Sequence, residues 1–325
     1  MNAPRRPGSP QNRFGARPAV RPPARFSGPP SGRMPGLYYN RSFINKIERE
    51  AVLAYLASLH PIWESRFSEH NPPPEGEAQR QLLRPVYWLG NWQFACLNYY
   101  HPPKGIENRC VRAEPFPPPL RKLVLQMEQI ARRMFTGADM PKDWHLNTCL
   151  VNFYGNRLER VGNTVKRIDC ARVGEHKDFE PGPVASMSFG ERAMFQFVSS
   201  RGSGSSHVMF QQWLDDGSLQ LFGGRKLKAQ LFHRVQRVDK RDGHAFPVQV
   251  TDFETRRLNL TFRYVPEEHI LPYASLPPEA RSDVRGYMQA LAQHSPYFAG
   301  ELKKAGQPVL ESPADQPFRM NRADT

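Results

Sequence analysis

Residues 184–198 read VASMSFGERAMFQFV, in which two short apolar and aromatic runs meet at the turn FGER. Period-two alternation on both sides of a turn is typical of two β-strands. Runs of the same kind recur after Pro141, at NTCLVNFY (147–154), HVMFQQWL (207–214), SLQLF (218–222), QLFHRVQRV (230–238) and LNLTFRYV (258–265). Seven short strands separated by turns predict an antiparallel sandwich or jelly roll, not a doubly wound parallel sheet.

Helical patterns lie outside this β-rich region. In residues 40–59, apolar side chains recur at helical spacing, at Phe43, Ile47, Ala51 and Ala54. Ser42 or Asn40 could cap this helix. Residues 117–135 begin with prolines and place a second apolar stripe on one face: Leu120, Val124, Met127, Ala131 and Met134. We expect these N-terminal helices to flank one side of the sheet, so the fold is mixed α/β with an all-β core. Residues 277–294 predict one further helix, followed by a loose tail.

The positive charge of the chain is concentrated at its N-terminus. The net charge is +14, and the first acidic residue is Glu48, preceded by nine Lys or Arg residues. Residues 1–35 are also dense in Pro and Gly, so we expect a disordered tail. An Arg-rich tail suits contact with a polyanion such as nucleic acid, but a solubilising tail or an organelle-targeting peptide fits the composition equally well.

Several classes of protein are disfavoured by composition. There is no run of about 18 apolar residues for a membrane span and no short apolar core of a secretory signal near the start, so a cytoplasmic location is expected. The four cysteines are Cys96, Cys110, Cys149 and Cys170. They are too widely spaced for a Cys-x-x-Cys zinc site or a dense disulfide framework, so we expect reduced thiols. Nothing in the sequence indicates an oligomeric state.

Two histidines and one aspartate in the β-rich region are candidate metal ligands. His176 and Asp178 occur in EHKDFE (175–180), and His233 occurs in a later strand, LFHRV. If 176 and 178 lie in one strand, their side chains point to the same side, and two imidazoles with one carboxylate form the facial triad of non-haem Fe(II) oxygenases. Taken alone, a His-x-Asp pair is more often a solvated turn, and a histidine in an apolar strand is more often a core residue.

Two arginines strengthen the case for a metal site. Arg257 and Arg263 lie on the same side of an alternating strand in RRLNLTFR (256–263). Arginine forms bidentate, charge-assisted bonds with carboxylates, so the pair could hold a dicarboxylate by its two ends. The alternative interpretation is a strand of surface ion pairs, which would not explain the upstream His and Asp.

At these motifs the sequence resembles the AlkB-like Fe(II)/2-oxoglutarate-dependent dioxygenase family. The resemblance runs from about Leu37 to Val265 and rests on CLVNFYG, HKDFEPGPVASMSFGERAMFQF, LFGGRKLKAQLFHRVQRV and above all Arg-x-Asn-x-Thr-x-Arg at 257–263. It implies a double-stranded β-helix, or jelly roll, at residues 141–266. Residues 36–140 would then hold the N-terminal helices and a nucleotide-recognition lid, and residues 267–325 a C-terminal helix and tail.

The resemblance also assigns roles to individual residues. It makes His176, Asp178 and His233 the Fe(II) ligands. Five residues would bind 2-oxoglutarate: Asn152, Tyr154, Arg257, Asn259 and Arg263. Substrate contacts would come from Glu180 and from aromatic residues of YWLGNWQFACLNYYHPP (87–103), namely Trp88, Trp92 and Tyr100. The alternative interpretations are a solvated loop charge for Glu180 and core packing for the aromatic residues.

The resemblance implies Fe(II) and 2-oxoglutarate as cofactors, O2 as co-substrate and nucleic acid as partner. The reaction would be oxidative dealkylation of alkylated bases, with release of succinate, CO2 and an aldehyde, on a base extruded from the stack. An alternative is a hydroxylase or demethylase of a protein or small molecule, and another is a nucleic-acid-binding protein without catalysis. One departure from the family is the long, basic connection at 155–175, which we expect to affect substrate entry.

Overall fold

The computed structural model describes residues 34–97, 110–202, 207–236, 246–248 and 250–310. The expected N-terminal tail, except for its last two residues, and Tyr100 lie outside this part of the chain. Among the described helices, none has both the length and the apolar character needed to cross a membrane.

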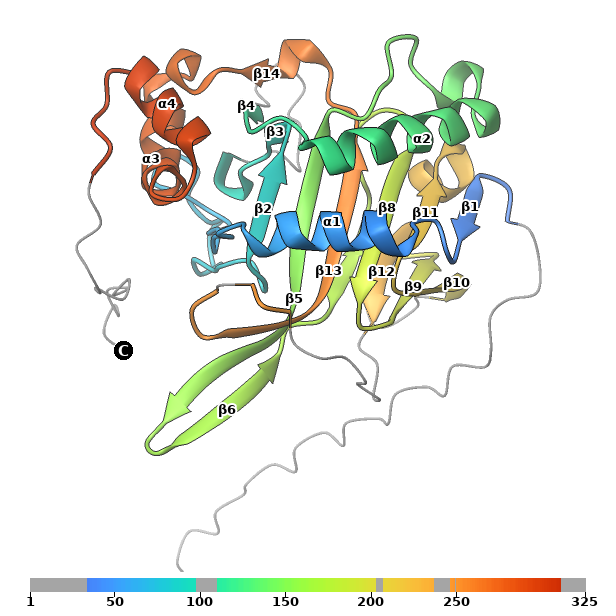
Figure 1. Ribbon diagram of the computed structural model, residues 1–325, viewed down its shortest axis with the longest axis horizontal. Coiled ribbons are helices and arrows are strands. Elements are labelled where there is room, and N and C mark those ends of the chain that lie inside the picture. The colour runs from blue at the N-terminus through green and yellow to red at the C-terminus, as the bar shows by residue number, and fades with distance from the viewer. Residues whose placement is uncertain (1–33, 98–109, 203–206, 237–245, 249, 311–325) are drawn as a thin grey trace, which may run out of the picture.

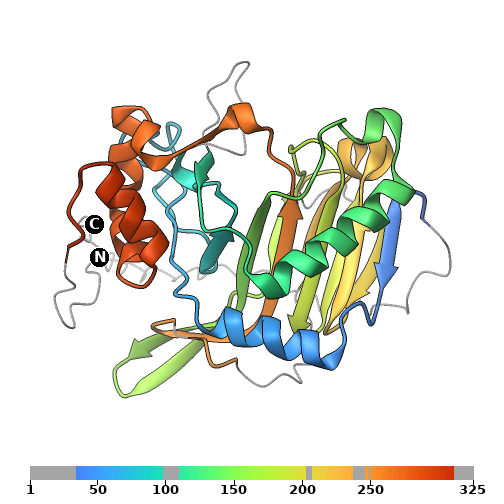
Figure 2. The same ribbon diagram turned by 45° about the horizontal axis from the view of Figure 1, so that its top comes forward.

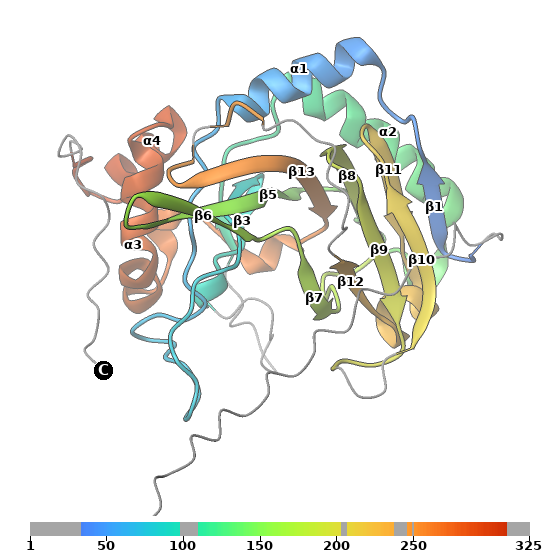
Figure 3. The ribbon, with the colours of Figure 1, turned by 90° about the horizontal axis from the view of Figure 1, so that it is seen from below.

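Two antiparallel sheets form the core. The larger one has seven strands, of which six follow the order β1 (Leu37–Asn40), β11 (Ser218–Phe222), β8 (Val184–Gly190), β13 (Phe253–Arg263), β5 (Thr148–Val161) and β2 (Val86–Leu89). The smaller sheet has the order β10 (Val208–Leu214), β9 (Ala193–Val198), β12 (Phe232–Gln236) and β7 (Val173–His176). Figure 3 shows the two sheets side by side, in the mostly β core predicted from the strand patterns.

Aromatic side chains fill the space between the two sheets at one end. Phe195 and Phe197 of β9 contact Phe222 of β11, with ring centroids 5.8 and 5.4 Å apart. Val184 of β8 and Leu214 of β10 belong to the same buried cluster. Three residues of this cluster, Phe195, Leu214 and Phe222, also line the cavity described below, so the inward face of these strands forms its apolar part.

Helices α1 (Lys46–Ala57) and α2 (Pro118–Met134) lie across the outer face of the larger sheet (Figures 1 and 2). The expected apolar face of α2 is buried except at Met134, its last residue, which is 37% exposed. The stripe expected for α1 is wrong, because Ile47 is 80% exposed and Val52 and Leu56 are the buried residues.

The start of α1 also differs from the expectation. Asn45 is the N-cap, in place of Ser42 or Asn40. Its side-chain Oδ1 accepts from the Glu48 amide at 2.9 Å, and the Glu48 carboxylate accepts from the Asn45 amide at 3.3 Å. This reciprocal pair is a capping box, and it starts the helix three residues after Ser42 and five after Asn40.

The C-terminal part contains α3 (Pro278–Ala292) and a second helix that the sequence did not predict, α4 (Pro296–Lys304). Ser295 caps α4, and Phe298 from its first turn packs edge-on against Trp92 at 5.8 Å. Trp92 belongs to β3 (Asn91–Trp92), which pairs with β4 (Cys110–Arg112); β4 also pairs with β14 (Ile270–Leu271). This small sheet connects the C-terminal helices to the core.

The long connection at 155–175 is mostly a projecting hairpin. Strand β5 continues to Val161, the chain reverses through Gly162 at φ 60°, and β6 (Thr164–Asp169) pairs back along β5. The hairpin extends beyond the larger sheet in Figures 1 and 3. The extra residues therefore form an arm that begins at the sheet, and only its final part, β7, returns to the two-sheet core.

Candidate active site

His176, Asp178 and His233 come together between the two sheets. His176 and His233 are opposite each other in the antiparallel pair of β7 and β12. Their ring centroids are 4.2 Å apart, and each of the three residues offers one ligand atom within 4.8 Å of the other two. Asp178 follows the end of β7 rather than sharing a strand with His176, so a turn and not strand alternation brings its carboxylate to the imidazoles.

Hydrogen bonds fix the orientation of two of these side chains. His176 Nδ1 lies 2.8 Å from the Gly174 carbonyl, to which it donates, and this leaves Nε2 with a free lone pair. Asp178 Oδ1 accepts from the Nε and Nη2 of Arg263 at 2.9 and 2.8 Å. Asp178 Oδ2 is buried and has no hydrogen-bond donor among the described residues, although it lies 3.3 Å from His233 Nε2.

The protonation states suit a metal ion. Burial alone would raise the pKa of Asp178, but the Arg263 guanidinium and the two imidazoles outweigh burial and hold this pKa well below its usual range. Burial, followed by the neighbouring His176, lowers the pKa of His233 to about 3, and burial also lowers the pKa of His176. One carboxylate with an unpaired oxygen and two neutral imidazoles are a donor set that fits Fe(II).

Four predicted co-substrate residues meet on the inner face of β5 and β13. The strand register places Arg257 opposite Tyr154 and Asn259 opposite Asn152. The Arg257 guanidinium lies 4.8 Å from the centre of the Tyr154 ring and donates from Nη2 to Ser188 Oγ at 3.0 Å. Its Nε is buried without a partner among the described residues, and burial lowers its pKa. An anion in this position would satisfy the arginine.

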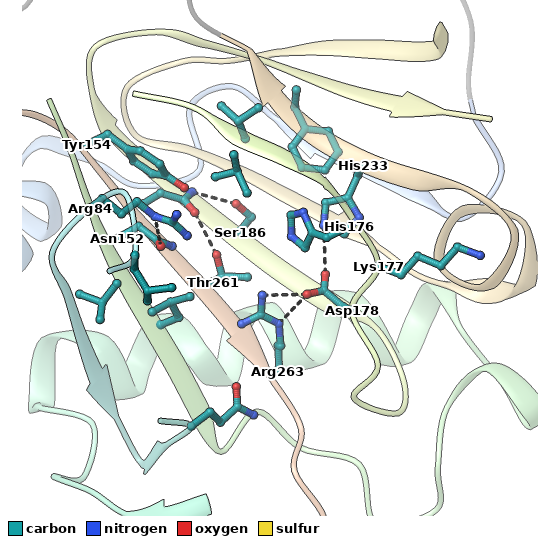
Figure 4. A pocket seen from close by; sticks show the side chains of 18 of the residues that line it. Arg84, Asn152, Tyr154, His176, Lys177, Asp178, Ser186, His233, Thr261 and Arg263 are labelled. Carbon is teal, nitrogen blue, oxygen red and sulfur yellow. Dashed lines mark hydrogen bonds and ion pairs between the residues drawn. The ribbon is translucent and has the colours of Figure 1, made fainter. Parts of the chain in front are cut away.

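Asn259 and Arg263 of β13 are held by contacts within the protein. Asn259 donates from Nδ2 to Ser186 Oγ and to the Met187 carbonyl, both at 2.9 Å, and accepts from Thr261 Oγ1 at 2.9 Å. Arg263 donates to Asp178 and also forms an ion pair with Glu180, whose Oε1 lies 3.4 Å from the arginine Nε. Figure 4 shows Arg263 directed at Asp178, with His176 and His233 above Asp178 in the view.

Arg84 is a site residue that the sequence did not suggest. It lies two residues before β2 and donates from Nε to Asn152 Oδ1 at 2.6 Å, as Figure 4 also shows. Its guanidinium lies 5.1 Å from the Tyr154 ring, so Arg84 and Arg257 both contact this tyrosine. This hydrogen bond fixes the orientation of the Asn152 amide group on the cavity lining. The alternation of residues 84, 86 and 88 toward one side was the only available signal.

A cavity of about 500 Å³ joins these groups. Its lining contains the three candidate metal ligands and all five predicted co-substrate residues. Of the three predicted substrate contacts that the structure describes, Trp88 alone lies on the lining. Glu180 is buried against Arg263, its main-chain carbonyl accepts from Lys228, and Trp92 is fully buried in the core.

The chain is similar to known proteins in three comparisons: with family models, with curated proteins and with solved structures. The family model described as the 2OG-Fe(II) oxygenase superfamily matches residues 36–263. The DNA N(6)-methyladenine demethylase ALKBH1C of Arabidopsis thaliana is 31% identical over 123 residues, which cover 35% of this chain and 23% of that protein. The chain thus spans about a quarter of the length of this relative.

Solved structures are more distant. The structure of OsALKBH1 is 17% identical with a TM-score of 0.42, and the match covers 72% of this chain and all of that one. YcfD, a ribosomal oxygenase from Escherichia coli in complex with cobalt and 2-oxoglutarate, is 11% identical with a TM-score of 0.31, over 89% of this chain and 58% of that one.

Proposed function

We propose that this chain, which belongs to the 2OG-Fe(II) oxygenase superfamily, removes alkyl groups oxidatively from the bases of nucleic acid. The chain is an AlkB-like, Fe(II)- and 2-oxoglutarate-dependent dioxygenase. The observation that carries the proposal is one cavity that contains the His-Asp-His triad, an arginine with an unpaired donor and an indole wall. The partial likeness to a DNA N(6)-methyladenine demethylase supports the choice of nucleic acid as substrate.

His176, Asp178 and His233 would hold the metal from one side. When bound, Fe(II) supplies the activation of O2 and 2-oxoglutarate that hydroxylates an alkyl carbon. Arg263 keeps the Asp178 carboxylate ionised and fixes its orientation through two hydrogen bonds. A hydroxylated N-alkyl group then collapses to an aldehyde and the free base, a step that needs no further catalytic side chain.

The 2-oxoglutarate site follows from charge and burial. The unpaired Nε of Arg257 takes the distal carboxylate, and Asn152, held by Arg84, donates its amide nitrogen beside it. Apolar side chains on the cavity lining exclude water around the carbon chain: Phe195, Leu214, Phe222 and Val235.

Cationic side chains on the lining support an anionic substrate. They are Arg66, Lys177 and Arg201. Attraction between these groups and phosphates would hold a nucleic-acid strand at the cavity in any sequence context. The Arg-rich segment before residue 34 would add contacts of the same kind.

The test uses purified protein with Fe(II), ascorbate, 2-oxoglutarate and a single-stranded oligonucleotide that carries a methylated base. Formaldehyde and succinate released together, and abolished in His176→Ala, would support the proposal. If succinate forms in proportion to the oxidation of a protein or small molecule, and no methylated oligonucleotide is demethylated, the chain would instead be a hydroxylase or demethylase of that protein or small molecule. Neither product under any of these conditions would refute both versions.

A further inference from the structure

One wall of the cavity is made by the N-terminal part of the chain and is not used by the metal or by 2-oxoglutarate. Glu64, Leu82, Trp88 and Gln93 form it. Trp88 belongs to β2, which pairs with β5 beside Leu150, while Glu64 and Gln93 lie in the segments before and after β2 and β3. This wall therefore shares the cavity with the triad but comes from a separate region of the sequence.

Glu64 braces this wall rather than facing a ligand. Its Oε1 accepts from Trp92 Nε1 at 2.7 Å, and its Oε2 accepts from the Ala95 amide at 2.8 Å. Trp88 also lies within hydrogen-bonding reach of the carboxyl group, although burial still raises the pKa of Glu64 to about 7. Both oxygens are thus occupied by the protein, and the carboxyl group holds the two indoles in place.

Gln93 is the unsatisfied group of the wall. Its side chain is 0% exposed, and neither Nε2 nor Oε1 has a hydrogen-bond partner among the described residues. Its neighbours Trp92 and Phe94 are stacked, with ring centroids 5.1 Å apart and an interplanar angle of 20°, so the backbone around Gln93 is held firmly. Each buried polar group without a partner costs about 1–3 kcal/mol. The Gln93 amide therefore presents an unpaired donor, Nε2, beside an unpaired acceptor, Oε1, and a ligand with an adjacent acceptor and donor could pair with both.

We infer that Gln93 reads the N7 and N6 edge of an adenine base placed against this wall. The amide Nε2 would donate to N7, and Oε1 would accept from the N6 amine, the bidentate pairing of glutamine with adenine. The inference rests on the proposed function and adds the substrate class to it. Guanine presents two acceptors at this edge and would leave Oε1 without a donor.

The edge that is read determines where the alkyl group lies. Contact through N7 and N6 leaves the N1 side of the ring free to face the triad. An adenine methylated at N1 or at N6, with the N6 methyl turned toward N1, keeps both groups that Gln93 requires. A cytosine methylated at N3 has lost the acceptor next to its amine. The assigned substrates are therefore adenines alkylated at N1 or N6, in preference to 3-methylcytosine.

The test changes one atom of the base and one side chain of the protein. Oligonucleotides would carry methylated adenine or its 7-deaza analogue, in which N7 is replaced by C–H, and affinity would be measured by fluorescence anisotropy with Mn(II) in place of Fe(II). Wild-type protein should bind the 7-deaza oligonucleotide about tenfold more weakly, the loss expected for one buried hydrogen bond. Gln93→Leu should bind both oligonucleotides equally, at the weaker level, while its affinity for 2-oxoglutarate stays unchanged.

Equal binding of the two oligonucleotides by the wild-type protein would overturn the inference, and this comparison does not depend on whether the variant folds. A folded Gln93→Leu protein that still discriminates N7 from C–H would overturn it as well. Formaldehyde released from 3-methylcytosine but not from methylated adenine would refute the role of Gln93 alone. Absence of formaldehyde from every methylated oligonucleotide would instead refute the proposed function.

Discussion

Replacement of Arg263 by glutamine tests how the protein prepares its metal site. Arg263 and Asp178 are 4% and 7% exposed, and two N–H groups of the arginine bond to one carboxylate oxygen at 2.9 and 2.8 Å. A hydrogen bond to a charged group contributes about 1.5–3 kcal/mol, and loss of a group that orients a metal ligand weakens metal binding about 10- to 100-fold. We expect Arg263→Gln to bind Mn(II) more weakly by a factor in that range.

Calorimetric titration with Mn(II), without 2-oxoglutarate, measures this effect. Arg257→Gln is the matched control, because Arg257 lies on the same strand, is 2% exposed and bonds to Ser188 rather than to a metal ligand. This control should keep its affinity for Mn(II) and lose affinity for 2-oxoglutarate. Unchanged Mn(II) affinity in a folded Arg263→Gln protein, or an equal loss in both variants, would refute the role given to Arg263.

Three further predictions concern other contacts. The pKa of Glu64 is raised from 4.5 to about 7 in the folded state, so the folded protein binds one more proton than the unfolded chain between these pH values, and its stability should fall by about 3 kcal/mol as pH rises from 4.5 to 7. Glu64→Gln should remove this pH dependence from the thermal unfolding of the protein, and an unchanged pH dependence would contradict the raised pKa of Glu64. Arg84→Gln should weaken 2-oxoglutarate binding to Mn(II)-loaded protein about tenfold, since Asn152 loses the donor that orients its amide, and equal affinity would show that Asn152 needs no such support. Asn45→Ala should lower the free energy of unfolding in urea by about 1 kcal/mol, and a loss below about 0.3 kcal/mol would show that the capping pair contributes little.

Much of the inner pocket could be predicted because strand alternation is a local rule. Arg257, Asn259 and Arg263 share a face of β13, and the pairing of β13 with β5 brings Asn152 and Tyr154 beside them. The same rule does not hold past the end of a strand. Glu180 follows Asp178 by two residues, but β7 ends at His176, and the turn directs Glu180 to Arg263 and away from the cavity lining.

Arg84 and Gln93 show what the sequence could not supply. Arg84 matters because β2 pairs with β5 at the level of Asn152, a contact across 68 residues of chain. Gln93 is notable only because its amide is buried without a partner, which depends on packing from Trp92, Phe94 and the C-terminal helices. Pairing between distant segments and complete burial of one side chain have no signature at a single position.

The arm formed by β5 and β6 offers a place to attach a reporter. All four cysteines are buried, and none forms a disulfide within the part of the chain that the structure describes. Asn163 is exposed in the turn of this hairpin, and a Cβ added at the adjacent Gly162 would meet no atom within 4 Å, so the turn is open to solvent. A cysteine introduced at Asn163 should therefore react selectively with a maleimide dye. Because β5 carries Asn152 and Tyr154 at its other end, such a dye would sit at the tip of the hairpin that starts in the pocket, yet outside the pocket. Its fluorescence would report the arrival of a large polymer without a change to the reacting groups.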